Sequence, residues 1–98
     1  MAIINKEYTM KRNPDFLLRD VADTLVVVPV GTATAAFPGM ITLNASGAYI
    51  WELLEQEQTV ESLVAALTER YEVTEEKARE DVQSFVNRLI PTGAILES

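Results

Sequence analysis

The sequence predicts an α+β domain in which a small antiparallel β-meander is followed by three α-helices. Three observations lead to this prediction. The chain has 98 residues, which is the size of one domain. Its first half, up to Leu43, contains short apolar runs typical of strands, and from Asn44 onward the apolar residues recur with the period of helices. Connections of a few residues join these elements, which favours helices on one side of a sheet.

The N-terminal residues show no regular period. Residues 1–15 mix charged side chains with Asn13, Pro14 and Asp15, and we interpret them as an arm or loosely attached tail that ends in a turn. The folded domain is therefore expected to span residues 16–98.

The expected strands cover residues 16–21, 25–30 and 40–43. The second is a β-branched run typical of a buried strand, and Pro29 should lie near its end or at a bulge because proline cannot donate to a ladder. Residues 22–24 form a short turn, and the small residues 31–36, followed by Pro38 and Gly39, connect to the third strand. That strand is expected at an edge of the meander.

Three helices are expected to begin at the capping residues Asn44, Thr59 and Thr74. Their apolar faces are marked by Gly47, Ile50, Trp51 and Leu54, by Val60, Leu63, Val64, Leu67 and Tyr71, and by Ala78, Val82, Phe85, Val86, Leu89 and Ile90. The helical spacing places Trp51 in the core rather than in a binding site. Pro91 and Gly93 end the third helix, and the short apolar tail 94–96 is expected to pack back on the domain.

The composition argues against catalysis and against a metal or other cofactor. The chain has no cysteine and no histidine, so it offers no thiolate nucleophile and no imidazole acid or base. Zinc sites are built mainly from these two residue types. The carboxylates and tyrosines that remain are scattered as a solvated surface requires. We therefore expect neither an enzyme nor a metalloprotein.

The charge distribution argues against nucleic-acid binding. The net charge is −7, of which residues 1–20 contribute +1 and the remaining 78 residues −8. Duplex binding needs a basic face, which this distribution does not provide.

The longest apolar run, 25–30, is too short to span a bilayer, and the first residues lack a signal peptide's apolar segment. We expect a cytoplasmic protein, although a chain without cysteine is equally compatible with export.

A set of residues in a particular order resembles a known family. The set comprises Arg19 and Val21, residues 25–28, Leu43 and Asn44, Ala48, Ile50 and Trp51, Thr59, Leu67 and Tyr71, Asp81, Val82, Phe85 and Leu89, and residues 93–96. A generic trihelical domain does not require two of these patterns: Leu-Asn before a Trp-containing helix, and Phe-x-x-x-Leu-x-x-x-Gly near the end. Together they resemble the PqqD-like family of precursor-peptide recognition elements, over about four fifths of the chain.

The resemblance implies a non-catalytic, winged-helix-like domain. Such domains bind the leader of a ribosomally made precursor peptide and present its core to a modifying enzyme, often of the radical S-adenosylmethionine type. The leader adds antiparallel to the third strand, in the cleft between that strand and the third helix. The pyrroloquinoline quinone branch favours an Asp-Gly-like turn after the first helix, whereas residues 55–58 are Glu-Gln-Glu-Gln here. The recognition role therefore carries over, and the particular pathway does not.

The expected peptide-binding residues are Met40, Ile41, Thr42, Leu43, Lys77, Val82, Phe85, Val86 and Arg88. The third strand carries no lysine to protect its edge, and the apolar stripe of the third helix is wider than one core contact requires. Arg88, next to Phe85 and Leu89, is the first candidate to pair with acidic leader residues. Alternatively, the arm or a second copy covers the edge, both apolar lines are core, and the cations are solvated. Arg19 is expected to pair with an acidic neighbour.

Two other functions remain open at this stage. A winged-helix nucleic-acid-binding module would share the topology but lacks the charge. A self-associating structural module would use the same open edge to form a homodimer. The sequence favours the leader-binding module over both.

Overall fold

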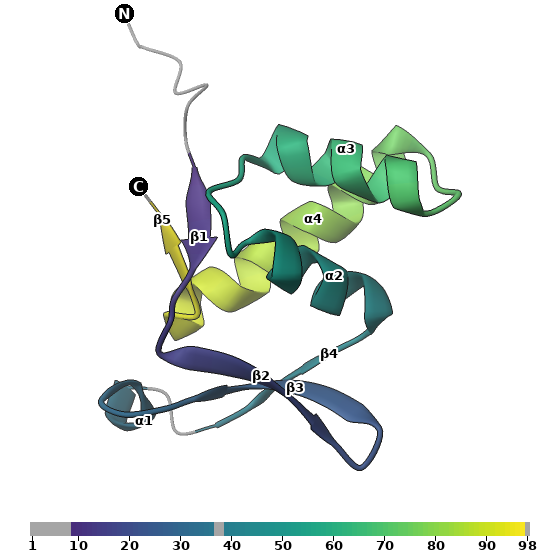
Figure 1. The fold of residues 1–98 in the computed structure, drawn as a ribbon. Coiled ribbons are helices and arrows are strands. Elements are labelled where there is room, and N and C mark those ends of the chain that lie inside the picture. The colour runs from purple at the N-terminus through teal and green to yellow at the C-terminus, as the bar shows by residue number, and fades with distance from the viewer. Residues whose placement is uncertain (1–8, 37–38, 98) are drawn as a thin grey trace, which may run out of the picture.

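The computed structural model describes residues 9–36 and 39–97 (Figure 1). Along the chain the elements run β1, β2, β3, α1, β4, α2, α3, α4, η1 and β5. A three-stranded antiparallel sheet in the order β2-β3-β4 lies on one side of the helices α2, α3 and α4, and β1 and β5 form a separate pair beside them. The predicted α+β class, a three-stranded meander followed by three helices, is confirmed.

The sheet follows the predicted strands closely. Its members are β2 (Phe16–Val21), β3 (Thr24–Pro29) and β4 (Ile41–Leu43). The turn between β2 and β3 has two residues, Ala22 and Asp23, both with positive φ (52° and 67°), as the type I′ hairpin requires. Pro29 is the last residue of β3, as expected of a residue that cannot donate to a ladder. Of the connection to β4, residues 33–36 form a single helical turn, α1 (Ala33–Ala36), that the sequence did not predict. Pro38 of the predicted turn lies outside the described residues.

All three predicted caps are confirmed. The helices are α2 (Ala45–Leu53), α3 (Val60–Arg70) and α4 (Glu75–Leu89). The side chains of Asn44, Thr59 and Thr74 accept hydrogen bonds from backbone N–H groups in the first turns, and Thr59 forms a reciprocal capping box with Ser62. After α4, a 3₁₀ turn, η1 (Ile90–Thr92), ends at Gly93, whose φ of 89° suits glycine.

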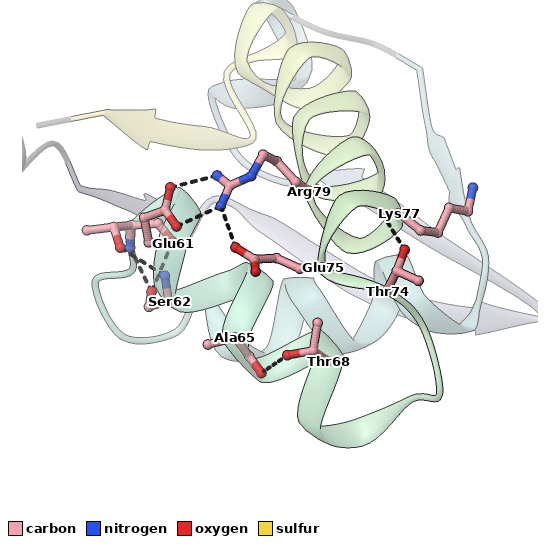
Figure 2. A network of polar contacts seen from close by, with 9 residues as sticks. Glu61, Ser62, Ala65, Thr68, Thr74, Glu75, Lys77 and Arg79 are labelled. Carbon is pink, nitrogen blue, oxygen red and sulfur yellow. Dashed lines mark hydrogen bonds and ion pairs between the residues drawn. The ribbon is translucent and has the colours of Figure 1, made fainter.

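Arg79 ties α3 to α4 on the surface. Figure 2 shows its guanidinium reaching from α4 to Glu61 on α3 and to Glu75 on its own helix. Its two nitrogens lie 2.6 and 2.8 Å from the Glu61 carboxylate oxygens. This bidentate geometry fixes the relative position of the two helices more specifically than a single contact would.

The ends of the described chain meet in a strand pair that the sequence did not predict. β1 (Met10–Arg12) runs antiparallel to β5 (Ile95–Glu97). Met10 is 1% exposed, and its backbone exchanges hydrogen bonds of 2.8 and 2.9 Å with Gln58. The loose attachment expected for residues 1–15 is therefore wrong for residues 10–12, whereas residues 1–8 lie outside the described part. The tail 94–96 does pack back, since Ala94 and Ile95 are buried.

One hydrophobic core joins the sheet to the helices. Its largest fully buried side chains are Trp51, Met10, Ile50, Leu54, Leu63, Leu67, Leu89, Val27 and Val82. Trp51 is 1% exposed, which confirms its predicted place in the core. Within residues 9–36 and 39–97, no group of three or more acidic side chains is arranged to hold a metal ion. None of the described helices is long and apolar enough to cross a membrane.

Candidate functional site

The third strand of the sheet, β4, has an open edge. Among the residues that the structure describes, it pairs with β3 on one side only, and Thr42 lies opposite Val26. Val30 donates a hydrogen bond of 2.8 Å to the Asp15 carbonyl, which indicates that the even-numbered residues of β3 turn their backbone groups toward β2. Val26 therefore faces β2, and its partner Thr42 turns its N–H and C=O away from β3. These are the groups that an added strand would bind.

Arg88 reaches this edge from α4. Its Nη2 donates a hydrogen bond to the carbonyl oxygen of Thr42. The contact joins the last turn of α4 to the middle of the edge strand and agrees with the outward direction of the Thr42 carbonyl. One outward backbone group of β4 thus binds a cation, and the outward N–H beside it remains directed away from the sheet.

A small groove of about 110 Å³ lies next to this edge, between the start of α2 and the face of α4. It is lined by Leu43, Asn44, Ser46, Gly47, Ile50, Asp81, Ser84, Phe85 and Arg88. Asn44 is held in place as a cap by accepting a hydrogen bond of 2.8 Å from the Gly47 N–H. A Cβ at Gly47 would lie 3.1 Å from the Asn44 Oδ1 atom, so glycine allows the capping side chain its close approach. The groove is apolar at Phe85 and polar along its rim.

The structure brings some of the predicted binding residues together. Leu43, Phe85 and Arg88 line the groove, and Thr42 contacts Arg88. Met40 precedes β4 and is 61% exposed, which leaves it accessible beside the edge.

Other predicted residues lie away from the groove surface. Ile41, Val82 and Val86 are buried in the core, whereas Ile90 is only partly buried and Phe85 also lines the groove. Lys77 lies in the first turn of α4, where its Nζ is 3.1 Å from Asp81 and 3.8 Å from Glu80. The hydrogen bond with Asp81 is the main cause that raises the pKa of Lys77 above its usual value.

Several residues of the groove were missed as binding residues. Asn44, Gly47 and Ile50 were recognised only as a cap and as members of an apolar stripe. Asp81 and Ser84 precede Phe85 and Arg88 by one helical turn, and this spacing of four residues was the signal that places them on the same face. Arg19 also differs from expectation, because among the described residues its side chain has no ion pair.

Comparison with solved structures identifies the fold. The structure named "TbiB1 in Complex with the TbiA(beta) Leader Peptide" matches with a TM-score of 0.67 at 24% sequence identity, over 87% of this chain and 93% of that chain. The structure named "Lasso peptide synthetase B1 complexed with the leader peptide" matches with a TM-score of 0.68 at 21% identity, over 89% and 96% of the two chains. At these identities the matches show a shared fold.

The family is identified from the sequence. A search of curated proteins finds no match. The model of the family described as "Coenzyme PQQ synthesis protein D (PqqD)" matches residues 18–95, which include the sheet except for the first two residues of β2, the three helices and the start of β5. This match covers well over half of the chain and agrees with the resemblance carried by its residues. The chain therefore belongs to the PqqD family.

Proposed function

We propose that this chain is a non-catalytic module that captures the leader of a ribosomally made precursor peptide and presents it to a modifying enzyme. The observation that carries the proposal is the open edge of β4, where the backbone of Thr42 faces outward beside a groove that contains Phe85 and Arg88. The names of two structures with the same fold each include a leader peptide, which supports this assignment.

The edge and the groove supply different parts of the recognition. A leader strand paired with β4 would gain main-chain hydrogen bonds at Thr42, which give affinity without reading side chains. Specificity would come from the groove, where Phe85 contacts an apolar leader residue and Arg88 a carboxylate. Met40 and Leu43 flank the pairing segment. The buried Ile41, Val82 and Val86 would support these contacts from beneath, and Lys77 would lie at the far end of α4.

The modifying enzyme belongs to the proposal as a partner. We propose a radical S-adenosylmethionine enzyme, on the strength of the family resemblance. A ribosomally made precursor is available in the cytoplasm, and we therefore place the module there. The turn at residues 55–58 differs from the pyrroloquinoline quinone branch, so the proposal names no product.

A substitution at Thr42 tests strand addition. The N–H of Ile41 faces β3 by the same alternation, and its side chain is 6% exposed, so Ile41→Pro would damage the fold itself. Thr42→Pro removes only an outward donor and keeps the carbonyl that binds Arg88. The variant loses the hydrogen bond that the Thr42 N–H would donate to the leader, and the proline ring crowds the added strand. Together these effects should weaken binding of a synthetic leader segment by about tenfold. Thr42→Ala is the matched control, since it keeps the N–H and should change the affinity less than about twofold.

The measurement is fluorescence anisotropy with labelled synthetic leader segments of candidate precursors. Circular dichroism establishes that both variants fold. Equal affinity of folded Thr42→Pro and Thr42→Ala for a leader that binds the parent chain would contradict strand addition at β4. Backbone amide shifts that cluster around Thr42 and Phe85 on titration would support it.

A further inference from the structure

A second hollow of the described surface lies at the opposite edge of the sheet from β4. It has a volume of about 980 Å³ and runs along β2, between this strand, the β1–β5 pair and the end of α2. Its apolar floor includes Phe16 and Trp51, which are 3% and 1% exposed. Leu17 and Leu96 also line it and are 39% and 48% exposed, so two of the exposed large apolar side chains of the chain lie here. We call this hollow the β2 groove.

The cations of the β2 groove are unusual for this chain. Apart from Lys6, which lies outside the described residues, most Lys and Arg side chains have partners within the chain. The partnered cations are Arg12 (Glu55 and the Trp51 ring), Arg70 (the rings of Tyr49 and Tyr71), Lys77 (Glu80 and Asp81), Arg79 (Glu61 and Glu75) and Arg88 (Thr42). The side chains of Lys11 and Arg19 have neither an ion pair nor a hydrogen bond in the part that the structure describes, and both line the β2 groove.

We propose that the β2 groove docks an acidic segment of a partner protein that carries apolar anchor residues. The anchors would cover Leu17 and Leu96 over the floor of Phe16 and Trp51, and carboxylates would pair with Lys11 and Arg19. Burial of exposed apolar surface supplies affinity, and unpaired cations at the rim select the charge of the occupant. Glu55, the acidic residue of the lining, already lies 3.9 Å from Arg12 and offsets this selection only in part.

The rest of the chain strengthens this charge selection. Residues 21–98 carry a net charge of −8, so an acidic segment is repelled over most of the surface. A partner segment with the opposite charge would be attracted almost anywhere on the molecule. Among the described residues Lys11 and Arg19 are the unpaired cations, so complementarity directs an acidic segment to the β2 groove, which is how electrostatics produces specificity.

The occupant is a polypeptide segment rather than a small anion. Within residues 9–36 and 39–97, β2 pairs with β3 alone, and by the alternation described above Leu18 turns its backbone N–H and C=O to the open side of β2. Leu18 also lines the groove. A peptide can bind these groups while its side chains contact the floor and the rim.

The β2 groove can be occupied at the same time as the small groove beside β4 that is proposed to bind the leader. They share no lining residue, and they lie at opposite edges of the sheet, along β2 and β4. Occupation of the β2 groove does not depend on leader binding.

An NMR titration of the isotopically labelled full chain tests the docking surface. The probe is a short synthetic peptide of Glu and Leu, compared with a peptide in which Lys replaces Glu and with one in which Ser replaces Leu. The Glu-Leu peptide should shift the amide signals of Lys11, Leu17, Arg19 and Leu96. The other two peptides should bind at least about tenfold more weakly.

Two double variants of equal charge separate a specific site from general attraction. The double variant Lys11→Gln/Arg19→Gln should bind the Glu-Leu peptide about tenfold more weakly than the parent chain. The double variant Arg70→Gln/Lys77→Gln should change the affinity by less than about twofold. Equal weakening by both pairs, shifts confined to Thr42 and Phe85, or equal binding of the Lys peptide would overturn the proposal. Shifts of the β2 groove on dilution without peptide would instead assign it to a second copy of the chain. A parallel leader titration, read at Thr42 and Phe85, reports separately on the proposed function.

Discussion

The guanidinium of Arg88 binds the backbone carbonyl of Thr42, a residue 46 positions earlier in the chain. Thr42 is the middle residue of the edge strand β4, and an added strand would bind the same carbonyl. Charged side chains are a common means of protecting open sheet edges from unwanted pairing. Arg88 thus covers the edge in the free protein, and it must share or release the carbonyl when a peptide pairs with β4.

Substitution of Arg88 should therefore affect acidic and neutral leaders in opposite directions. In the proposed function Arg88 is the cation that would pair with leader carboxylates, so Arg88→Ala should weaken the binding of an acidic leader by about fivefold, or roughly 1 kcal/mol. The same variant frees the Thr42 carbonyl for pairing with an added strand. It should therefore strengthen the binding of a leader whose acidic residues are changed to amides. Fluorescence anisotropy with the two leaders measures both effects, and Arg88→Lys is the control that keeps the charge. A change of the same sign for both leaders would contradict the role assigned to Arg88.

Local signals in the sequence account for most of the predicted fold. The caps Asn44, Thr59 and Thr74 mark helix starts within a few residues of chain. The turn predicted at residues 22–24 locates the hairpin, although Thr24 is already the first residue of β3. β1 was not predicted because its three residues, Met10–Arg12, contain one apolar and two charged side chains, and its partner β5 lies at the other end of the chain.

The candidate site was predicted only in part for the same reason. Phe85 and Arg88 follow from the pattern of one helix, and Leu43 from the edge strand. The contact of Arg88 with Thr42 joins two elements that are distant in sequence, so no local pattern contains it. The unpaired state of Arg19 likewise depends on which acidic side chains the fold brings near, and sequence spacing does not determine that.

Met10 should contribute strongly to stability although it lies in the predicted arm. Its side chain is 1% exposed in the core, so Met10→Ala should lower the free energy of unfolding by about 3 kcal/mol through lost burial and a residual cavity. Urea denaturation measures the change. Lys11→Ala, at the exposed neighbouring position, is the control and should change it by less than about 0.5 kcal/mol. Equal effects of the two substitutions would mean that β1 is not packed in solution.

The turn between β2 and β3 offers a stabilising substitution. Ala22 has a φ of 52°, where a Cβ costs about 1–2 kcal/mol, whereas glycine adopts this conformation freely. The added freedom of glycine in the unfolded chain offsets about 0.4–1 kcal/mol of this gain. The net effect is a small increase in the free energy of unfolding, so Ala22→Gly should raise the melting temperature by a few degrees. Ala65→Gly, in the exposed interior of α3, should lower it. A decrease in both variants would refute the strained turn.

The ion pair between Glu61 and Arg79 makes part of the stability depend on pH (Figure 2). The hydrogen bond from Arg79 holds the pKa of Glu61 below its usual value of 4.5, against a smaller opposing effect of burial. A carboxylate with a lowered pKa in the folded state stabilises the protein above its unfolded pKa, and this contribution is lost as the pH falls through the folded value. Because both side chains reach solvent, the contribution is small and salt weakens it.

Replacing Arg79 should therefore return Glu61 to ordinary titration. In Arg79→Gln the guanidinium is gone, so the pKa of Glu61 should rise toward 4.5, and the acid loss of stability that belongs to this pair should disappear. Carboxyl carbon shifts in an NMR titration follow Glu61 directly, and urea denaturation at neutral and acid pH follows the stability. The control is Arg70→Gln, which removes the same charge. Arg70 lies at the end of the same helix as Glu61 and stacks on Tyr49, so this variant should leave the pKa of Glu61 unchanged. The same rise of the Glu61 pKa in both variants would show that net charge, rather than the bidentate contact with Arg79, lowers it.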